Sequence, residues 1–261
     1  MANVKPFFIS ATAVTNCLRG VVFQKQQKTP TPLHPEIKEL LDLFRTFAET
    51  GQRIQTQLRT FWQQKGVLVK SEEWIPRNDV GFTGKFDAIC RINGRIVVYE
   101  IKGASKSFFT WVSEHKEPRP EHKMQAMIYH RLLSRELPDL DVRLLYVSRH
   151  TFTQEGKLKG IEVPVEYSDD GFQVAVDRAA AVRTALEGGP LPDAAPAVDI
   201  AWPETKRDVS MKALTCRHHG LCLDDVNWYI NAKKELGQEV APMPEQVPIP
   251  ERVRDEPDVP F

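Results

Sequence analysis

The chain has 261 residues, of which 41% are hydrophobic and 27% charged, and its 35 basic residues balance its 35 acidic ones. This composition excludes a wholly disordered chain, a collagen and a coiled-coil rod, and no apolar run approaches the roughly 18 to 20 residues that a membrane span needs. The start of the chain has no sustained apolar stretch, so we expect no export signal, a cytoplasmic location, and cysteines that are reduced, structural or metal-bound.

Charge is distributed unevenly along the chain. Residues 1–70 carry ten Lys or Arg against four Asp or Glu, whereas residues 237–261 carry two basic and six acidic residues. A basic body with an acidic tail fits a polyanion such as DNA as a partner, and a solvated surface with uneven ends fits the same counts. Six prolines in the tail predict an extended or disordered segment, which could contact protein partners.

The hydrophobic period predicts the secondary structure in chain order. The predicted elements are a helix over 35–65, strands over 67–74, 81–92 and 94–103, a helix over 120–136, strands over 142–148 and 158–167, and a helix over 169–187. Pro35 suits the first helical position and Gly66 the stop of the first helix. The order predicts an α/β fold in which a mixed central β-sheet is flanked by helices.

Composition divides the chain into four parts. Residues 1–34 form an N-terminal segment, and residues 35–187 hold the predicted sheet and helices. Residues 188–236 begin with a Gly- and Pro-rich linker and continue as a short element that contains cysteines. Residues 237–261 are the acidic tail.

The predicted hairpin gathers charged side chains. Asn93-Gly94 between two apolar runs is a strong signal for a two-residue turn. In that register Asp87 lies opposite Glu100, and Lys102 points to the same face as Glu100. Two opposed carboxylates repel each other, and a hard divalent cation such as Mg²⁺ removes that cost. The alternative is an ordinary ion pair between Glu100 and Lys102 with Asp87 on the rim.

These residues carry a resemblance to a known family. GKFDAI, followed by YEIKG, resembles the core motif of the PD-(D/E)XK nuclease superfamily, with its restriction-endonuclease-like fold, at Asp87, Glu100 and Lys102. Gln125 and Tyr129 in HKMQAMIYHRLL are similar to the helix motif of the RecB-like branch. They also share a helix face by their i, i+4 spacing.

The resemblance implies a metal-dependent DNA nuclease, most similar to exonucleases that act on single strands or DNA ends. Asp87, Glu100 and the backbone carbonyl of Ile101 would hold Mg²⁺ or Mn²⁺, and Lys102 would position or activate water. Gln125 and Tyr129 would shape the site. The alternative is a catalytically weak or inactive DNA-binding subunit of a recombination, packaging or CRISPR-adaptation complex. No glycine-rich phosphate loop is present, so we expect no ATP-driven motor.

One position departs from the family pattern. The run from Gly51 to Gln55 is similar to a helix motif that carries a metal-binding histidine four residues after its glycine. Gln55 stands at the histidine position. A glutamine oxygen can ligate a hard cation, so Gln55 is a possible extra ligand, weaker than an anionic one.

The cysteines resemble those of the iron–sulfur members of this branch, which include CRISPR-adaptation and AddB-type nucleases. Cys17 lies in SATAVTNCLRG, which is similar to the N-terminal segment of those proteins, and Cys216 and Cys222 match two of their three C-terminal positions. The third position is Ala213. Four thiolates normally hold a [4Fe–4S] cluster. Cys90 is expected to be a buried core residue.

Three interpretations remain for Cys17, Cys216 and Cys222. They hold a cluster with a substitute ligand, they bind zinc together with His218 or His219, or they are free thiols left over from a lost site.

The segment between the third strand and the Gln125 helix combines charge with aromatic rings. It contains Lys106, Phe108, Phe109, Trp111, Lys116, Arg119, His122 and Lys123. Such a segment can hold single-stranded nucleic acid by charge and by stacking on bases, or it is a mobile loop with a small apolar anchor.

Overall fold

A computed structural model gives the fold of the chain. It describes residues 8–28, 30, 33–75, 81–195, 198–200, 207–209, 214, 216, 218 and 227–239. Most of the predicted acidic tail therefore lies outside the described residues. None of the described helices is both long enough and apolar enough to cross a membrane.

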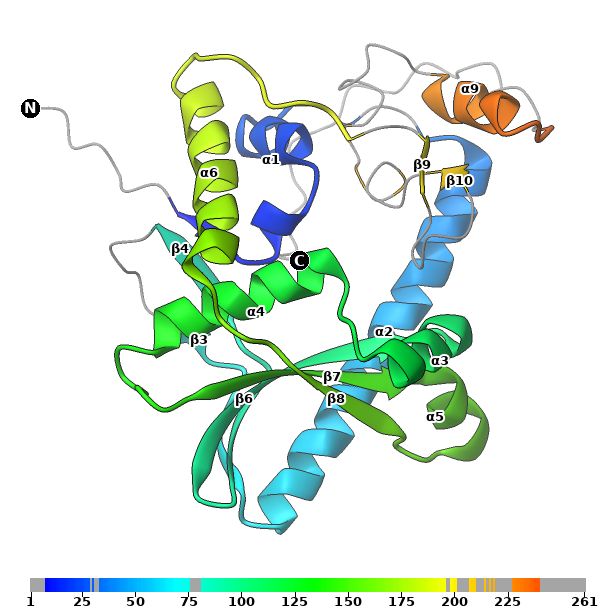
Figure 1. Ribbon diagram of the computed structural model, residues 1–261. Helices are drawn as coiled ribbons and strands as arrows, with labels where there is room; N and C mark the ends of the chain where they lie inside the picture. The colour runs from blue at the N-terminus through cyan, green and yellow to red at the C-terminus, as the bar shows by residue number, and fades with distance from the viewer. Residues whose placement is uncertain are drawn as a thin grey trace, which may run out of the picture.

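The main sheet has five strands in the order β2-β5-β6-β7-β8 (Figure 1). Their bounds are Leu68–Ser71, Ala88–Ile92, Arg95–Ala104, Asp141–Ser148 and Gly160–Pro164. Strands β6 and β7 run parallel, whereas the other neighbours are antiparallel. The mixed sheet predicted from the sequence is thus confirmed.

Shorter strands form two further sheets. One has the order β1-β4-β3, with bounds Ile9–Ser10, Phe82–Lys85 and Trp74–Ile75. The other pairs β9 (Val198–Ile200) with β10 (Arg207–Val209). The predicted strands over 67–74 and 81–92 are therefore each divided between two sheets. The first division lies at Glu72, which has φ 53°, and the second at Phe86 and Asp87, which join β4 to β5.

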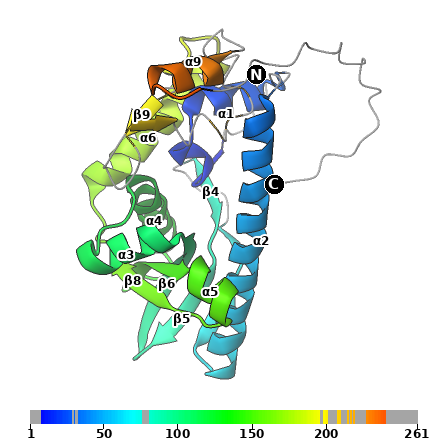
Figure 2. The same ribbon diagram turned by 90° about the vertical axis from the view of Figure 1, so that its right-hand side faces the viewer.

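Helices cover both faces of the main sheet (Figures 1 and 2). Helix α2 (Pro35–Gln64) packs on one face with α5 (Arg149–Glu155), around Tyr99 and Ile101. Helices α1 (Leu18–Lys25), α4 (Pro120–Leu133) and α6 (Asp169–Leu186) lie on the other side with the larger core cluster. Burial of both faces explains why β6 reads as a nearly continuous apolar run.

Helix α2 matches its predicted bounds to one residue, because its ends have local signals. Pro35 occupies the first turn, and the His34 ring accepts a hydrogen bond from the Glu36 N–H at 3.3 Å. Gly66 adopts φ 68° directly after the helix, a left-handed conformation that favours glycine. Helix α9 (Trp228–Glu235), in the C-terminal element, packs against the start of α2, where the Tyr229 hydroxyl donates to Glu36 at 2.9 Å.

For residues 106–115 the mobile-loop alternative is wrong, whereas the nucleic-acid-binding alternative stays a prediction. Residues Lys106–His115 form helix α3, and the Ser105 hydroxyl caps it by accepting from the Phe108 N–H at 3.3 Å. Phe108, Phe109 and Val112 are buried. Helices α1 and α5 also lacked a prediction, because each has at most eight residues and too few turns to display a period.

Candidate nuclease site

The hairpin forms in the predicted register. Ile92 pairs with Arg95, and Ala88 pairs with Tyr99. Asn93 and Gly94 both adopt positive φ, as a tight turn of this kind requires. Asp87 directly precedes β5, so the register brings it beside the segment of β6 that carries Glu100.

Asp87 is buried and is held by two donors. Its Oδ2 accepts a hydrogen bond from the Ile101 N–H at 2.6 Å, and its Oδ1 accepts from Gln55 Nε2 at 3.2 Å. Burial, together with the negative charge of Glu100, raises the pKa of Asp87 to about 7. Two carboxyl groups therefore share one poorly solvated site, and they ionise together only with a positive partner.

Lys102 joins the strand to helix α4. Its Nζ lies 2.7 Å from Glu100 Oε1 and 2.9 Å from Gln125 Oε1. Glu100 is 5% exposed, and its second oxygen, Oε2, is buried without a hydrogen-bond partner among the residues that the structure describes. The arrangement goes beyond the simple Glu100–Lys102 ion pair, because one carboxylate oxygen remains for a further cationic partner.

Gln125 and Tyr129 form a buried chain of hydrogen bonds behind Lys102. Gln125 Nε2 donates to the Tyr129 hydroxyl at 3.0 Å and to Thr12 Oγ1 at 3.4 Å. The Tyr129 hydroxyl donates to the Lys85 carbonyl at 3.1 Å. These bonds connect α4 to the N-terminal segment and to β4, so the predicted Gln-Tyr pair lies at the site with its side chains fixed.

Two parts of the site had no prediction. Thr12 lies in the segment SATAVTNC, whose resemblance to the family rests on its serine, its cysteine and the basic residue that follows. On the opposite rim Glu72 binds Arg59 at 2.7 Å and Lys85 at 3.6 Å, and its N–H donates to the Asp87 carbonyl. A single sequence gives no signal for these contacts, because they join residues that are far apart in the chain.

Replacing Gly84 by alanine is expected to disturb Tyr129. A Cβ at Gly84 would lie 2.5 Å from Tyr129 Cε1, and the ring, which is 1% exposed, has no room to move. We expect Gly84→Ala to lower the free energy of unfolding by about 1–3 kcal/mol, measured by urea denaturation. Gly51→Ala is the control, because nothing lies within 4 Å of that Cβ and alanine favours the helix by about 1 kcal/mol. Equal effects of the two substitutions would refute the contact.

The donor set at Asp87 and Glu100 suits a hard divalent cation. The site offers carboxylate oxygens, one of which has no partner among the described residues. The Ile101 carbonyl belongs to the residue whose N–H holds Asp87. Gln55 turns its amide nitrogen toward Asp87, and a half-turn of the amide would present its oxygen there. Among the described residues no group of three or more His, Cys, Asp or Glu is placed to hold a metal ion, so ligation would need water, amide or carbonyl oxygens in addition.

Two of the predicted cysteine ligands lie together. A Cβ at Gly20 would be 2.6 Å from the Cys216 sulfur and 3.8 Å from the Cys17 sulfur, so both thiols border the same turn of α1. The ring of His218 lies edge-on to Phe23, with centroids 6.2 Å apart. Cys222, His219 and Ala213 lie outside the described residues, and the cluster, zinc and free-thiol interpretations stay predictions. Cys90 is fully buried in the core, as predicted.

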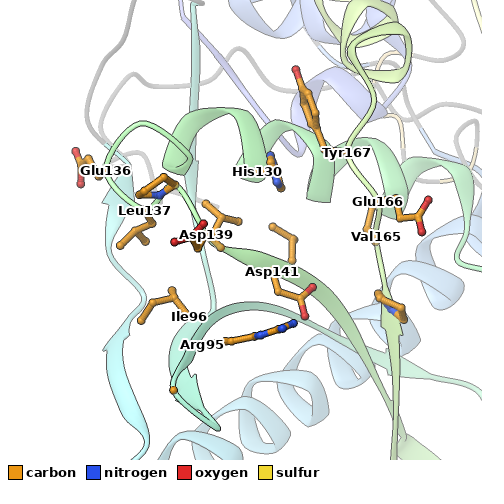
Figure 3. A pocket seen from close by; sticks show the side chains of 15 residues that line it. Arg95, Ile96, His130, Glu136, Leu137, Asp139, Asp141, Val165, Glu166 and Tyr167 are labelled. Atoms are coloured by element: carbon orange, nitrogen blue, oxygen red, sulfur yellow. The ribbon is translucent and has the colours of Figure 1, made fainter.

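A cavity of about 810 Å³ lies away from these groups, at the other end of β6 (Figure 3). It is bordered by Arg95, Asp141 and Glu166, and His130 stacks on Tyr167 with centroids 4.7 Å apart. Arg95 is the first residue of β6, whereas Lys102 lies near its last. The cavity therefore takes no part in the Asp87 site.

Solved structures resemble the chain at low sequence identity. SSO0001 is 21% identical over 69% of this chain and 77% of its own, with a TM-score of 0.46. The alkaline exonuclease LHK-Exo from Laribacter hongkongensis, in complex with dAMP, is 13% identical over 69% of this chain and 88% of its own, also with a TM-score of 0.46. No protein-family model matches the sequence, and no curated protein matches it significantly.

Proposed function

We propose that the chain is a divalent-metal-dependent deoxyribonuclease of the RecB-like branch of the PD-(D/E)XK superfamily. The observation that supports the proposal most is the meeting of four side chains from the β4–β5 connection, strand β6 and helix α4, namely Asp87, Glu100, Lys102 and Gln125. A buried Glu100 oxygen is left unpartnered in the described part of the chain. If the Glu100–Lys102 ion pair were only structural, burying the Asp87 carboxylate beside it would cost free energy without any benefit.

Asp87, Glu100 and the Ile101 carbonyl would hold Mg²⁺ or Mn²⁺, with Gln55 as a possible extra ligand. When bound, the cation supplies Lewis-acid polarisation of the phosphate and lowers the pKa of water. The protein prepares this site in its folded state, because the Ile101 N–H already fixes the orientation of the Asp87 carboxylate. The raised pKa of Asp87 in the metal-free protein is the electrostatic cost that a cation would remove.

Lys102 would act on the water and on the phosphate. An ammonium group has three N–H donors, and Glu100 and Gln125 occupy two of them. The third donor can face a non-bridging phosphate oxygen or the attacking water, where it would stabilise the negative charge that develops during hydrolysis. Tyr129 and Thr12 position Gln125, and Gln125 in turn positions Lys102.

Single-stranded DNA or a frayed DNA end is the proposed substrate. Trp74 is 66% exposed and lies opposite Lys85 across the β3–β4 pair. Lys85 is two residues before Asp87 in the sequence. Opposed residues of an antiparallel pair point to the same face, so an aromatic ring and a lysine lie together at the rim of the site. Unpaired bases stack on exposed aromatic rings, whereas a lysine attracts the phosphate backbone.

The test is cleavage of end-labelled single- and double-stranded DNA by the purified protein, with Mg²⁺, with Mn²⁺ and with EDTA. We expect digestion of single strands or ends with either metal and none with EDTA. Glu166→Gln, an exposed carboxylate at the distant cavity, should digest like the wild type. No digestion under any metal condition would refute the nuclease proposal.

One observation favours the alternative of a DNA-binding subunit that does not cut. Gln55 contacts Asp87 at the position where the family motif has a histidine, so this chain has one strong metal ligand fewer. The same assay separates the two functions. Tight binding of DNA ends without cleavage in any divalent metal would select the binding subunit.

A further inference from the structure

Two arginines lie at the edge of the main sheet where the parallel strands β6 and β7 end. Arg119 directly precedes α4, and its backbone N–H donates to the Tyr146 hydroxyl at 3.4 Å. Arg149 is the first residue after β7, and its Cγ and Cδ would lie 3.1 Å from a Cβ on Gly103. Gly103 follows Lys102 in β6, so both arginines are anchored within a few residues of the proposed site.

Aromatic rings hold both guanidinium groups. The Arg119 guanidinium lies 4.5 Å above the centroid of Phe108, and that of Arg149 lies 4.2 Å above Phe47. Stacking of this kind uses the flat face of the group and leaves its N–H donors, which point outward in the plane, available for another partner.

Those donors are not used within the described part of the chain. Neither arginine side chain makes a hydrogen bond or an ion pair there, although both are half-buried, and the Arg119 Nε is buried without a partner. Arg143, by contrast, binds Asp141 and Glu162, and Arg178 donates to two backbone carbonyls. Buried donors are normally satisfied, so the unpaired Arg119 Nε, beside a second arginine whose donors are also unused, indicates a partner outside the described residues.

The two charges also act on each other and on the site. Burial, and then the positive charge of Arg119, lower the pKa of Arg149. Burial, followed by the charges of Lys102 and Arg119, lowers the pKa of His122 to about 2, so this histidine is neutral and adds no positive charge of its own. The charges of Arg119 and Arg149 therefore repel each other, and an anion bound between them would relieve that repulsion.

We propose that Arg119 and Arg149 form a phosphate-binding subsite that holds a DNA phosphate next to the one being cleaved. The ligand class, a phosphate ester, follows from the fork of N–H donors that matches two phosphate oxygens. Its identity as DNA rests on the proposed function. The subsite would fix where the strand lies relative to Lys102, which makes the arginines positioning residues rather than catalytic ones.

The test measures binding of short fluorescein-labelled single-stranded DNA to the full-length protein in EDTA, which prevents metal-dependent cleavage. We expect Arg119→Gln and Arg149→Gln each to weaken binding by roughly tenfold, and the slope of log K against log salt to fall by about 0.7 for each lost phosphate contact. Arg131→Gln is the matched control, because Arg131 is an exposed arginine on the same helix α4, over Phe172. It should change neither quantity.

Three DNA probes distinguish the possible sources of the phosphate. The strands carry a 5′-phosphate, a 3′-phosphate or hydroxyls at both ends. If the glutamine variants lose affinity for one phosphorylated probe alone, the subsite binds that terminal phosphate. If they lose affinity equally for all three probes, the subsite binds an internal phosphodiester. Wild-type affinity and salt slope in both glutamine variants, on every probe, would overturn the proposal.

Folding and function are separated by two further measurements. Thermal midpoints show whether each glutamine variant is folded. If Arg149→Gln does not fold, Arg149→Lys tests the geometry of the donor fork instead. The lysine keeps the charge but lacks the planar donors, so we expect an intermediate affinity with the wild-type salt slope, and wild-type affinity would count against the subsite. If the wild type cleaves no DNA with any metal but Arg149→Gln still weakens binding, the subsite stands and the nuclease proposal fails.

Discussion

Replacing Lys102 by alanine is expected to lower kcat for DNA cleavage by roughly 10²- to 10⁴-fold with little change in DNA affinity, because a positioned proton donor contributes about that much to a hydrolytic step. The Lys102 Nζ contacts Glu100 at 2.7 Å and Gln125 at 2.9 Å, so strand β6 supplies the cation and helix α4 helps to hold it in place. Single-turnover cleavage of end-labelled single strands, with binding measured separately, distinguishes the two quantities.

Lys102→Arg and Lys70→Ala are the companions of that variant. Arginine keeps a permanent charge but is wider and does not release its proton near neutral pH, so Lys102→Arg should also bind DNA like the wild type without recovering the cleavage rate. Lys70 is an exposed lysine on β2, and its loss removes the same charge away from the site. Undiminished cleavage by Lys102→Ala would remove the catalytic assignment, since nothing else about the fold requires this lysine to touch Gln125.

Local signals made the hairpin predictable. The Asn93-Gly94 turn defines a two-residue loop, and in a hairpin the loop length and turn type fix the register of the two strands. The positions of Asp87, Glu100 and Lys102 follow from that register alone. The shared position of Gln125 and Tyr129 could be predicted from the helical period and a motif, because residues four apart in a helix lie on the same face.

Other parts of the site depend on tertiary packing, which no local pattern encodes. The Thr12 hydroxyl reaches Gln125 across 113 positions in sequence, and Arg149 comes close to Arg119 only because β7 lies parallel to β6. The helix over 106–115 was not predicted because basic and polar residues interrupt its apolar stripe. Ser105 gave a capping signal, and Phe108, Phe109 and Val112 have helical spacing. Charge alone is therefore a poor guide to loops.

Asp87→Asn is expected to stabilise the metal-free protein at pH 8 and to abolish its stabilisation by metal. Burial, and then the negative charge of Glu100, raise the pKa of Asp87 from its ordinary value of about 4 to about 7 in the folded protein. The folded state thus binds this proton more tightly than the unfolded state. The contribution of this bound proton to stability is complete below about pH 4 and is lost as the pH rises to about 7. Above that pH the folded state carries the full free-energy cost of a buried Asp87 carboxylate.

Asparagine has no proton to lose, and its amide oxygen can still accept from the Ile101 N–H, so Asp87→Asn removes that cost without removing the contact. In EDTA at pH 8 we expect the variant to exceed the wild type by a few kcal/mol in urea unfolding, with the gap closing toward pH 4. Adding Mn²⁺ at pH 8 should raise the Tm of the wild type and leave the variant nearly unchanged, since a ligand stabilises only the state that binds it. Two outcomes would show that Asp87 is an ordinary structural carboxylate: a variant that is less stable than the wild type at pH 8 in EDTA, or a variant whose Tm rises as much with Mn²⁺. Only a metal ligand destabilises the protein when the site is empty and stabilises it when the metal is bound.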